Sequence, residues 1–250
     1  YALSESPLPR LGLIVLQVDE TIEEDFRRLI PPDMARLHVT RVPSGADLTP
    51  ATIAAMADQL PAAAALLPPA ADFDVVGYAC TSGTTLIGAE RVTTLVRGST
   101  RTRHVTNPLT AACAAMQDLG LQRIALVSPY IASVADPIRH AFEARGIAVP
   151  ETLSFGEQVE ARVARIDPSS VAQAALDLGR SPGVDGVFLS CTNLRTLGII
   201  PELEATLGKP VLSSNRVLAW QLLRARVYEH HQQQVEAERS EQRNKMIGRG

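Results

Sequence analysis

The chain has few aromatic residues, few cysteines and no long apolar run. Only 4% of its 250 residues are aromatic although 46% are hydrophobic, so the core is built mainly from alanine, leucine and valine, which suits helices packed on parallel strands. No apolar segment reaches the roughly 18 residues that would span a bilayer. Three cysteines, an odd number, do not suggest a disulfide framework, and we interpret them as reduced thiols.

An excess of charge of either sign is also missing. The sequence has 24 lysines and arginines against 27 acidic residues, a formal net charge of −3, which predicts neither a nucleic-acid surface nor a polybasic membrane anchor. Residues 1–9 contain two prolines and no apolar run, unlike a signal peptide. We therefore expect a cytoplasmic protein that binds neither nucleic acid nor membrane.

Short apolar runs alternate with longer segments of helical pattern. The alternation of strand and helix indicates an α/β fold with parallel sheets covered on both faces. The predicted strands are residues 11–16, 36–42, 74–79, 104–106, 123–128, 148–155, 185–190 and 210–213, and the predicted helices are residues 49–66, 86–96, 109–119, 137–145 and 169–178.

The two halves of the sequence repeat each other. LGLIV at residues 11–15 matches RIALV at 123–127, Cys80 matches Cys191, and Asn107 matches Asn215, with offsets of 112, 111 and 108 residues. We predict two pseudo-symmetric Rossmann-like lobes, residues 1–118 and 119–223, which exchange end segments. Ligands of open α/β sheets bind beyond the carboxyl ends of the strands, so the active site is expected in the cleft between the lobes.

Residues 224–250 are polar and charged and predict a projecting helix or tail. The tail contains His230 and His231, but adjacent histidines do not share a helix face. We therefore predict no metal site there.

Both Cys80 and Cys191 follow an apolar strand and precede hydroxyl or amide residues and a predicted helix. The motifs are Cys80-Thr81-Ser82 and Cys191-Thr192-Asn193. The positive field of a helix N-terminus lowers a thiol pKa and favours the thiolate, which can act as base or nucleophile. Backbone N–H groups and the polar side chains that follow each cysteine can bind a carboxylate and stabilise the charge formed when the adjacent carbon loses a proton.

Core packing is the alternative, because buried cysteine is common. One such cysteine would favour packing, but two in matched positions favour catalysis. Cys113, in the helical run LTAACAAM, has no such setting and is predicted to be a core residue.

With the motifs CTSGTTLIG and SCTNLRT, the chain up to about residue 223 resembles the aspartate/glutamate racemase superfamily. It is most similar to the branch of maleate isomerases and arylmalonate decarboxylases, and within it to ectoine-utilisation racemase-like proteins. The resemblance implies that Cys80 and Cys191 are the catalytic thiols and that no metal or other cofactor takes part. We also expect a homo-oligomer.

The resemblance further implies that Thr81, Ser82 and Tyr130 bind substrate, Tyr130 having a simple strand-capping role as its alternative. Arylmalonate decarboxylases have glycine at the position of Cys80, which makes decarboxylation with one cysteine less favoured. Maleate isomerases have asparagine at the position of Asp19. An ionised Asp19 would repel a carboxylate but accept an ammonium or N–H group; alternatively it caps the next helix. The same two alternatives, binding of a cationic group and capping of the helix, apply to Glu20.

The first hypothesis is a cofactor-independent racemase or isomerase acting on a small carboxylate, an amino- or ectoine-derived acid, with Thr192 and Asn193 also binding substrate. One thiolate removes a proton and the opposite thiol returns one. The alternatives are maleate-type cis-trans isomerisation by thiolate addition, decarboxylation, and a non-catalytic carboxylate-binding protein.

Overall fold

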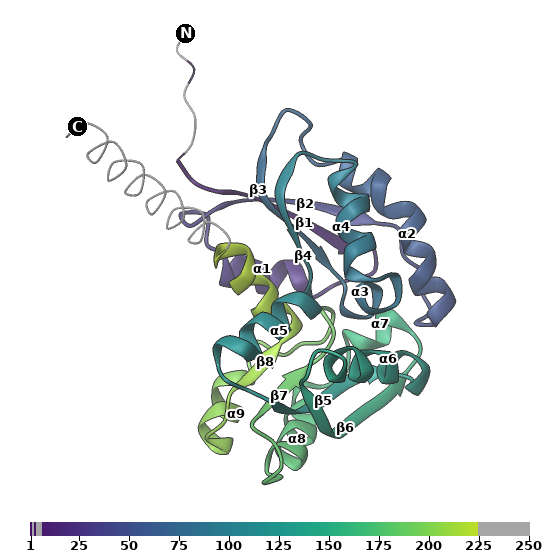
Figure 1. The fold of residues 1–250 in the computed structure, drawn as a ribbon, viewed down its shortest axis with the longest axis vertical. Coiled ribbons are helices and arrows are strands. Elements are labelled where there is room, and N and C mark those ends of the chain that lie inside the picture. Colours follow the sequence, from purple (N-terminus) through teal and green to yellow (C-terminus); the bar gives the residue numbers. More distant parts are fainter. Residues whose placement is uncertain (2, 4–6, 225–250) are drawn as a thin grey trace, which may run out of the picture.

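The computed structural model describes residues 1, 3 and 7–224, which form an α/β fold with two parallel sheets (Figure 1). The first sheet has the order β2-β1-β3-β4 and the second the order β6-β5-β7-β8, so the two sheets share one topology. The strands are β1 (Arg10–Leu16), β2 (Arg36–Val42), β3 (Phe73–Ala79), β4 (Thr102–Thr106), β5 (Arg123–Tyr130), β6 (Ala148–Glu157), β7 (Gly186–Leu189) and β8 (Val211–Ser213). The predicted fold class is confirmed.

The central strands are mostly apolar because helices cover both faces of each sheet. In β1, Leu13 pairs with Val39 of β2 and Gly77 of β3. Leu13 and Ile14 are both fully buried, although alternate side chains of a strand point to opposite faces. An alternating apolar–polar pattern would have predicted a solvent-exposed face, and β1 has none.

The helices follow the strands in the expected α/β order. They are α1 (Ile22–Leu29), α2 (Pro50–Ala65), α3 (Thr81–Ile87), α4 (Ala89–Arg97), α5 (Pro108–Asp118), α6 (Ala132–Glu143), α7 (Glu160–Val163), α8 (Pro168–Gly179) and α9 (Ile200–Leu207), and residues 214–224 are also helical.

Each half contributes one helix to the other. Helix α5 follows β4 of the first sheet but lies beside elements of the second lobe (Figure 1), where its Ala115 and Leu119 share a pocket with Leu212 and Val217. The helix at 214–224 follows β8 but packs on the first sheet. Leu218 and Leu222 of this helix pack with Leu11 and Leu13 of β1. The division into residues 1–118 and 119–223 stays a prediction.

The predicted strands are all present, whereas some helix predictions were wrong. The helix expected at 86–96 is two helices, α3 and α4, joined at Gly88, whose φ is +93°. Helix α6 begins at Ala132 instead of Pro137, because a proline within the helix costs one backbone hydrogen bond without ending it here. His230, His231 and the rest of the predicted tail lie outside the described residues. In residues 7–224, no helix is long and apolar enough to cross a membrane.

Candidate active site

Cys80 lies where β3 ends and α3 begins. Its backbone is extended and its sulfur accepts a hydrogen bond from the Gly83 N–H at 3.1 Å, so the thiol caps α3. The Ser82 hydroxyl lies 3.6 Å from the same sulfur. The first cysteine therefore has the setting that the sequence predicted, a strand end followed by a helix N-terminus.

Cys191 follows β7 with an unusual backbone conformation. Its φ is +121°, and it is the one described non-glycine residue with positive φ. L-residues adopt this region only under constraint from their surroundings. A turn follows Cys191, and the next helix, α9, begins at Ile200. The predicted helix directly after the second motif was therefore wrong, and the strained backbone sets the direction of this thiol instead.

Hydrogen bonds join the two cysteine motifs. The hydroxyl groups of Thr81 and Ser214 lie 2.8 Å apart, and the Ser214 oxygen also accepts the Cys191 N–H at 3.0 Å. Thr192 donates to the Ala79 carbonyl at 3.3 Å. The ends of β3 and β7 therefore meet, which brings together the motifs that lie 111 residues apart in the sequence.

Each thiol has a buried tyrosine beside it. The Tyr130 hydroxyl donates a hydrogen bond that lowers the pKa of Cys191, and Tyr130 also interacts with Cys80. Tyr78, which sequence reasoning did not single out, donates a hydrogen bond that acts to lower the pKa of Cys80. Tyr78 lies near the end of β3 and Tyr130 at the end of β5, so Tyr130 does lie in the site.

The prediction that helix N-termini lower both thiol pKa values was wrong for this arrangement. Burial raises the pKa of Cys80 to about 11 despite the hydrogen bonds from Ser82 and Gly83. Burial also raises the pKa of Cys191, and the charges of Glu160 and Asp19 raise it further. Desolvation of the thiolate outweighs the favourable field, so both thiols are protonated at neutral pH.

Asp19 enters the site from the loop between β1 and α1. Its Oδ1 accepts hydrogen bonds from the N–H groups of Thr21 and Ile22, both at 2.9 Å. Asp19 thus holds the first N–H groups of α1, although the N-cap residue itself is Thr21 and not Asp19. Its Oδ2 is buried, and no described residue makes a hydrogen bond of ordinary geometry with it. Burial raises the pKa of Asp19, although the backbone donors and the Thr192 side chain act in the opposite direction.

Glu160 is a site residue that sequence reasoning missed. It begins α7, is only 3% exposed, and accepts a hydrogen bond from the Asn193 amide at 3.0 Å. Burial, followed by the nearby Asp19 charge, raises the pKa of Glu160 to about 7. Its charge acts on both Cys80 and Cys191.

Asn193 is occupied by protein partners on both ends of its amide. Besides the bond to Glu160, its Oδ1 accepts the Glu20 N–H at 2.8 Å. In this arrangement the Asn193 amide holds Glu160 and the β1–α1 loop in place, and its predicted role as a carboxylate donor stays a prediction.

The rim of the site is closed by contacts between the lobes. Leu48 N–H donates to the Gln158 carbonyl at 2.7 Å, and Asp47 and Val159 form an antiparallel bridge. Glu20 pairs with Arg165 at 2.8 Å, an exposed surface contact and not part of the buried site. These contacts hold the two lobes together, and Cys80 and Cys191 are each only 4% exposed.

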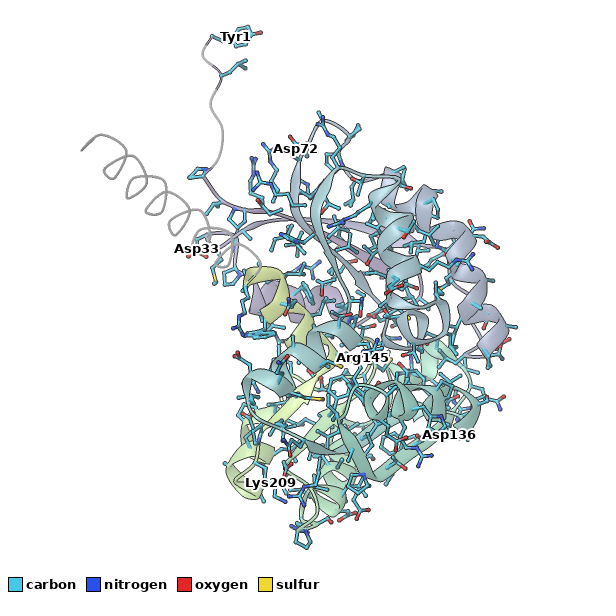
Figure 2. The ribbon with its side chains drawn as sticks, viewed as in Figure 1. Tyr1, Asp33, Asp72, Asp136, Arg145 and Lys209 are labelled. Atoms are coloured by element: carbon cyan, nitrogen blue, oxygen red, sulfur yellow. The ribbon has the colours of Figure 1, made fainter. Side chains whose placement is uncertain are left out.

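Other charged and thiol groups lie away from this junction. Figure 2 shows Asp72, Asp136 and Lys209 on the periphery of the two lobes. Cys113 is partly buried on α5 and packs against the core. Within residues 7–224, no three His, Cys, Asp or Glu side chains gather in an arrangement that would hold a metal ion.

The family profile described as arylmalonate decarboxylase matches residues 46–238, most of the chain. The chain belongs to the arylmalonate decarboxylase family. It is 35% identical to the arylmalonate decarboxylase of Bordetella bronchiseptica over 117 residues, which span 46% of this chain and 48% of that enzyme, about half of each. It is 26% identical to the maleate isomerase of Pseudomonas putida over 234 residues, covering 87% of this chain and 92% of that enzyme.

A solved relative adds chemical information. A cysteine-to-serine variant of the Nocardia farcinica maleate cis-trans isomerase, with a covalently bound succinylcysteine intermediate, is 26% identical with a TM-score of 0.80, covering 87% of this chain and 92% of that one. A cysteine of that relative therefore bonds to carbon. The predicted similarity to maleate isomerases and arylmalonate decarboxylases is confirmed, whereas closeness to ectoine-utilisation proteins stays a prediction.

Proposed function

We propose that this chain is a cofactor-independent isomerase in which Cys80 and Cys191 act on opposite faces of a carbon next to the carboxylate of a small nitrogen-bearing acid, such as an amino acid or an ectoine-derived acid. The observation that carries the proposal is the convergence of the two thiols. Tyr130 and Glu160 each interact with both of them.

In the proposed reaction, one cysteine acts as a thiolate and the other as a thiol. The thiolate removes the proton from the carbon, whose C–H electron pair moves into the carboxylate to form an enediolate. The opposite S–H then donates its proton to the other face, leaving that sulfur as the thiolate. The closed rim supports this route, because excluding water limits loss of the proton to solvent.

The raised thiol pKa values set a requirement on this reaction. Because burial disfavours the thiolate at both positions, one thiol has to release its proton to solvent as substrate binds. Tyr130 and the Gly83 N–H both donate toward sulfur. These donors stabilise the thiolate once it forms.

Maleate-type cis-trans isomerisation is the second candidate, and the succinylcysteine of the Nocardia relative favours it. Here the thiolate adds to a carbon–carbon double bond and forms a C–S bond. Rotation about the resulting single bond follows, and the C–S bond then breaks. No carbon-bound proton is removed in this route.

Turnover in deuterated water distinguishes the two candidates. The protein is incubated with a panel of small amino acids, dicarboxylates and cyclic amidine acids, and the product is analysed by mass spectrometry at low conversion. The proposed reaction places deuterium on the product carbon, whereas addition and elimination leave the product unlabelled. Unlabelled product from an active protein would therefore overturn the two-base proposal.

Serine variants complete the design. Cys80→Ser and Cys191→Ser should each abolish turnover, because serine is far too weak an acid to replace the thiol. Cys113→Ser, outside the site, is the matched control and should keep activity. If Cys80→Ser stays active and CO₂ is released, the reaction is a decarboxylation. If neither the parent protein nor any variant turns over a substrate, the chain is a binding protein.

A further inference from the structure

The site contains more negative charge than the proposed chemistry requires. Asp19 comes from the β1–α1 loop of the first lobe and Glu160 from the start of α7 in the second, and each is 3% exposed. Asp19 is close enough to Glu160 for its charge to raise the pKa of Glu160. Two carboxylates at this place repel a plain dicarboxylate substrate, so their presence requires another explanation.

The Asp19 side chain has one oxygen that the protein does not use. Oδ1 is occupied by the N–H groups of Thr21 and Ile22, whereas Oδ2 is buried and no described residue makes a hydrogen bond of ordinary geometry with it. The Thr192 side chain lies near enough to lower the pKa of Asp19. A buried carboxylate oxygen without a donor is unfavourable. Capping α1 needs one oxygen only, so the free one is available to a ligand that carries donors.

Glu160 is oriented toward the same place. The Asn193 amide holds its Oε1, and Asn193 is itself fixed by the Glu20 N–H. The charge of Glu160 reaches both thiols, and that of Asp19 reaches Cys191. No third His, Cys, Asp or Glu joins these two side chains in a metal-binding group within the described part of the chain, and an organic cation is a ligand complementary to their charge.

We propose that Asp19 and Glu160 together bind an ammonium group of the substrate, so that the protein acts on a small acid carrying a positive charge and discriminates against dicarboxylates. The inference rests on the proposed function only for the position of the reacting carbon between the thiols. Glu160 and Asp19 together then determine the preference for ammonium-bearing acids over dicarboxylates.

This arrangement also links binding to activation. The charge of Glu160 raises the pKa of both thiols. An ammonium group between Asp19 and Glu160 compensates that charge and so favours the thiolate. A substrate without the positive charge leaves the thiols protonated, which makes charge recognition part of the chemistry.

The test uses four-carbon acids that differ in one group: butanoate, 2-aminobutanoate, 4-aminobutanoate and succinate. Their dissociation constants are measured by calorimetry on the full chain. At least one amino acid should bind tenfold or more tightly than butanoate and succinate, and the better isomer shows how far the ammonium lies from the carboxylate. Tightest binding of succinate, or no binding of either amino acid at millimolar concentration, would overturn the inference.

Conservative variants test the two carboxylates. Asp19→Asn keeps an oxygen that can cap α1, and Glu160→Gln keeps one that accepts from Asn193. Each should reduce the preference for the amino acid over butanoate at least tenfold, and Glu202→Gln, on the exposed start of α9, should change nothing. An unchanged preference in both site variants would refute the role of the carboxylates.

Deuterium exchange separates this inference from the proposed function. Exchange into a product, together with a preference for succinate, would remove the ammonium site and keep the two-base chemistry. Tight amino acid binding without deuterium exchange would keep the ammonium site and remove the two-base chemistry.

Discussion

Replacing Glu160 by glutamine tests the electrostatic cost of this buried carboxyl group without any ligand. Its pKa is raised from the ordinary 4.5 to about 7, so the folded protein holds this proton more tightly than the unfolded chain does. The stability that the protonated group contributes is complete below pH 4.5 and is lost as the pH rises through about 7. Glutamine cannot ionise, and it keeps the oxygen that accepts from Asn193.

The size of the effect follows from the pKa. A rise from 4.5 to about 7 corresponds to roughly 3 kcal/mol of destabilisation at pH 9, and to less than about 1 kcal/mol at pH 5. Glu160→Gln should therefore be more stable than the parent chain at pH 9 by about 2–3 kcal/mol and nearly equal to it at pH 5.

Urea unfolding at pH 5, 7 and 9, followed by the fluorescence of the single tryptophan, measures this difference. Asp19, Cys80 and Cys191 face Glu160 and are present in both proteins, so the comparison at each pH reports Glu160 together with the effect of its charge on the two thiols. Glu202→Gln is the exposed control, with an expected change within about 0.5 kcal/mol at every pH. A stability difference that is independent of pH, or a loss of stability at pH 9, would refute the reasoning.

Three further results are expected. Cys191→Gly should be more stable than Cys191→Ala by about 1 kcal/mol in urea unfolding, because glycine adopts the φ of +121° without strain; equal stability would show that this backbone is relaxed. Gly83→Ala should lower the free energy of unfolding by about 1–3 kcal/mol, since its Cβ would lie 2.8 Å from the Cys80 sulfur. Gly198→Ala is the control and should be nearly neutral, because no atom lies within 4 Å of a Cβ at that position. Similar losses of stability in both variants would contradict the contact. Tyr130→Phe should raise the pH at which Cys191 is alkylated, because the hydroxyl lowers the pKa of that thiol, and peptide mass spectrometry would show whether Cys113 keeps its profile as the control.

The sequence predicted the sheets well because their signal is local. Buried parallel strands are short apolar runs that can be recognised in the sequence. The repeat at offsets near 110 residues predicted from the sequence that the two halves share one fold. The same repeat placed Cys80 and Cys191 at equivalent strand ends. Tyr130 was indicated only through the family resemblance, and Tyr78, which lies beside Cys80, was not indicated at all.

The remaining features depend on tertiary structure. Glu160 lies in the segment GEQVEARV, where nothing distinguishes it from an exposed glutamate; only the docking of α7 against the first lobe buries it, as the bond from its N–H to the Ala46 carbonyl at 2.9 Å shows. The direction of the thiol pKa was mispredicted for a similar reason. A helix N-terminus is visible in the sequence, but the desolvation that outweighs it depends on closure of both lobes.

The exchange of helices between the lobes has a consequence for how such a molecule arises. Leu218 and Leu222 of the second half pack with Leu11 and Leu13 of the first, while α5 of the first half lies beside the second sheet. Two identical ancestral halves that each placed their last helix on a partner would form a domain-swapped homodimer with this geometry. Joining the two copies in one chain preserves that assembly and allows each half to diverge. One gene can then carry Asp19 in one half and Glu160 in the other, an asymmetry that identical subunits could not have.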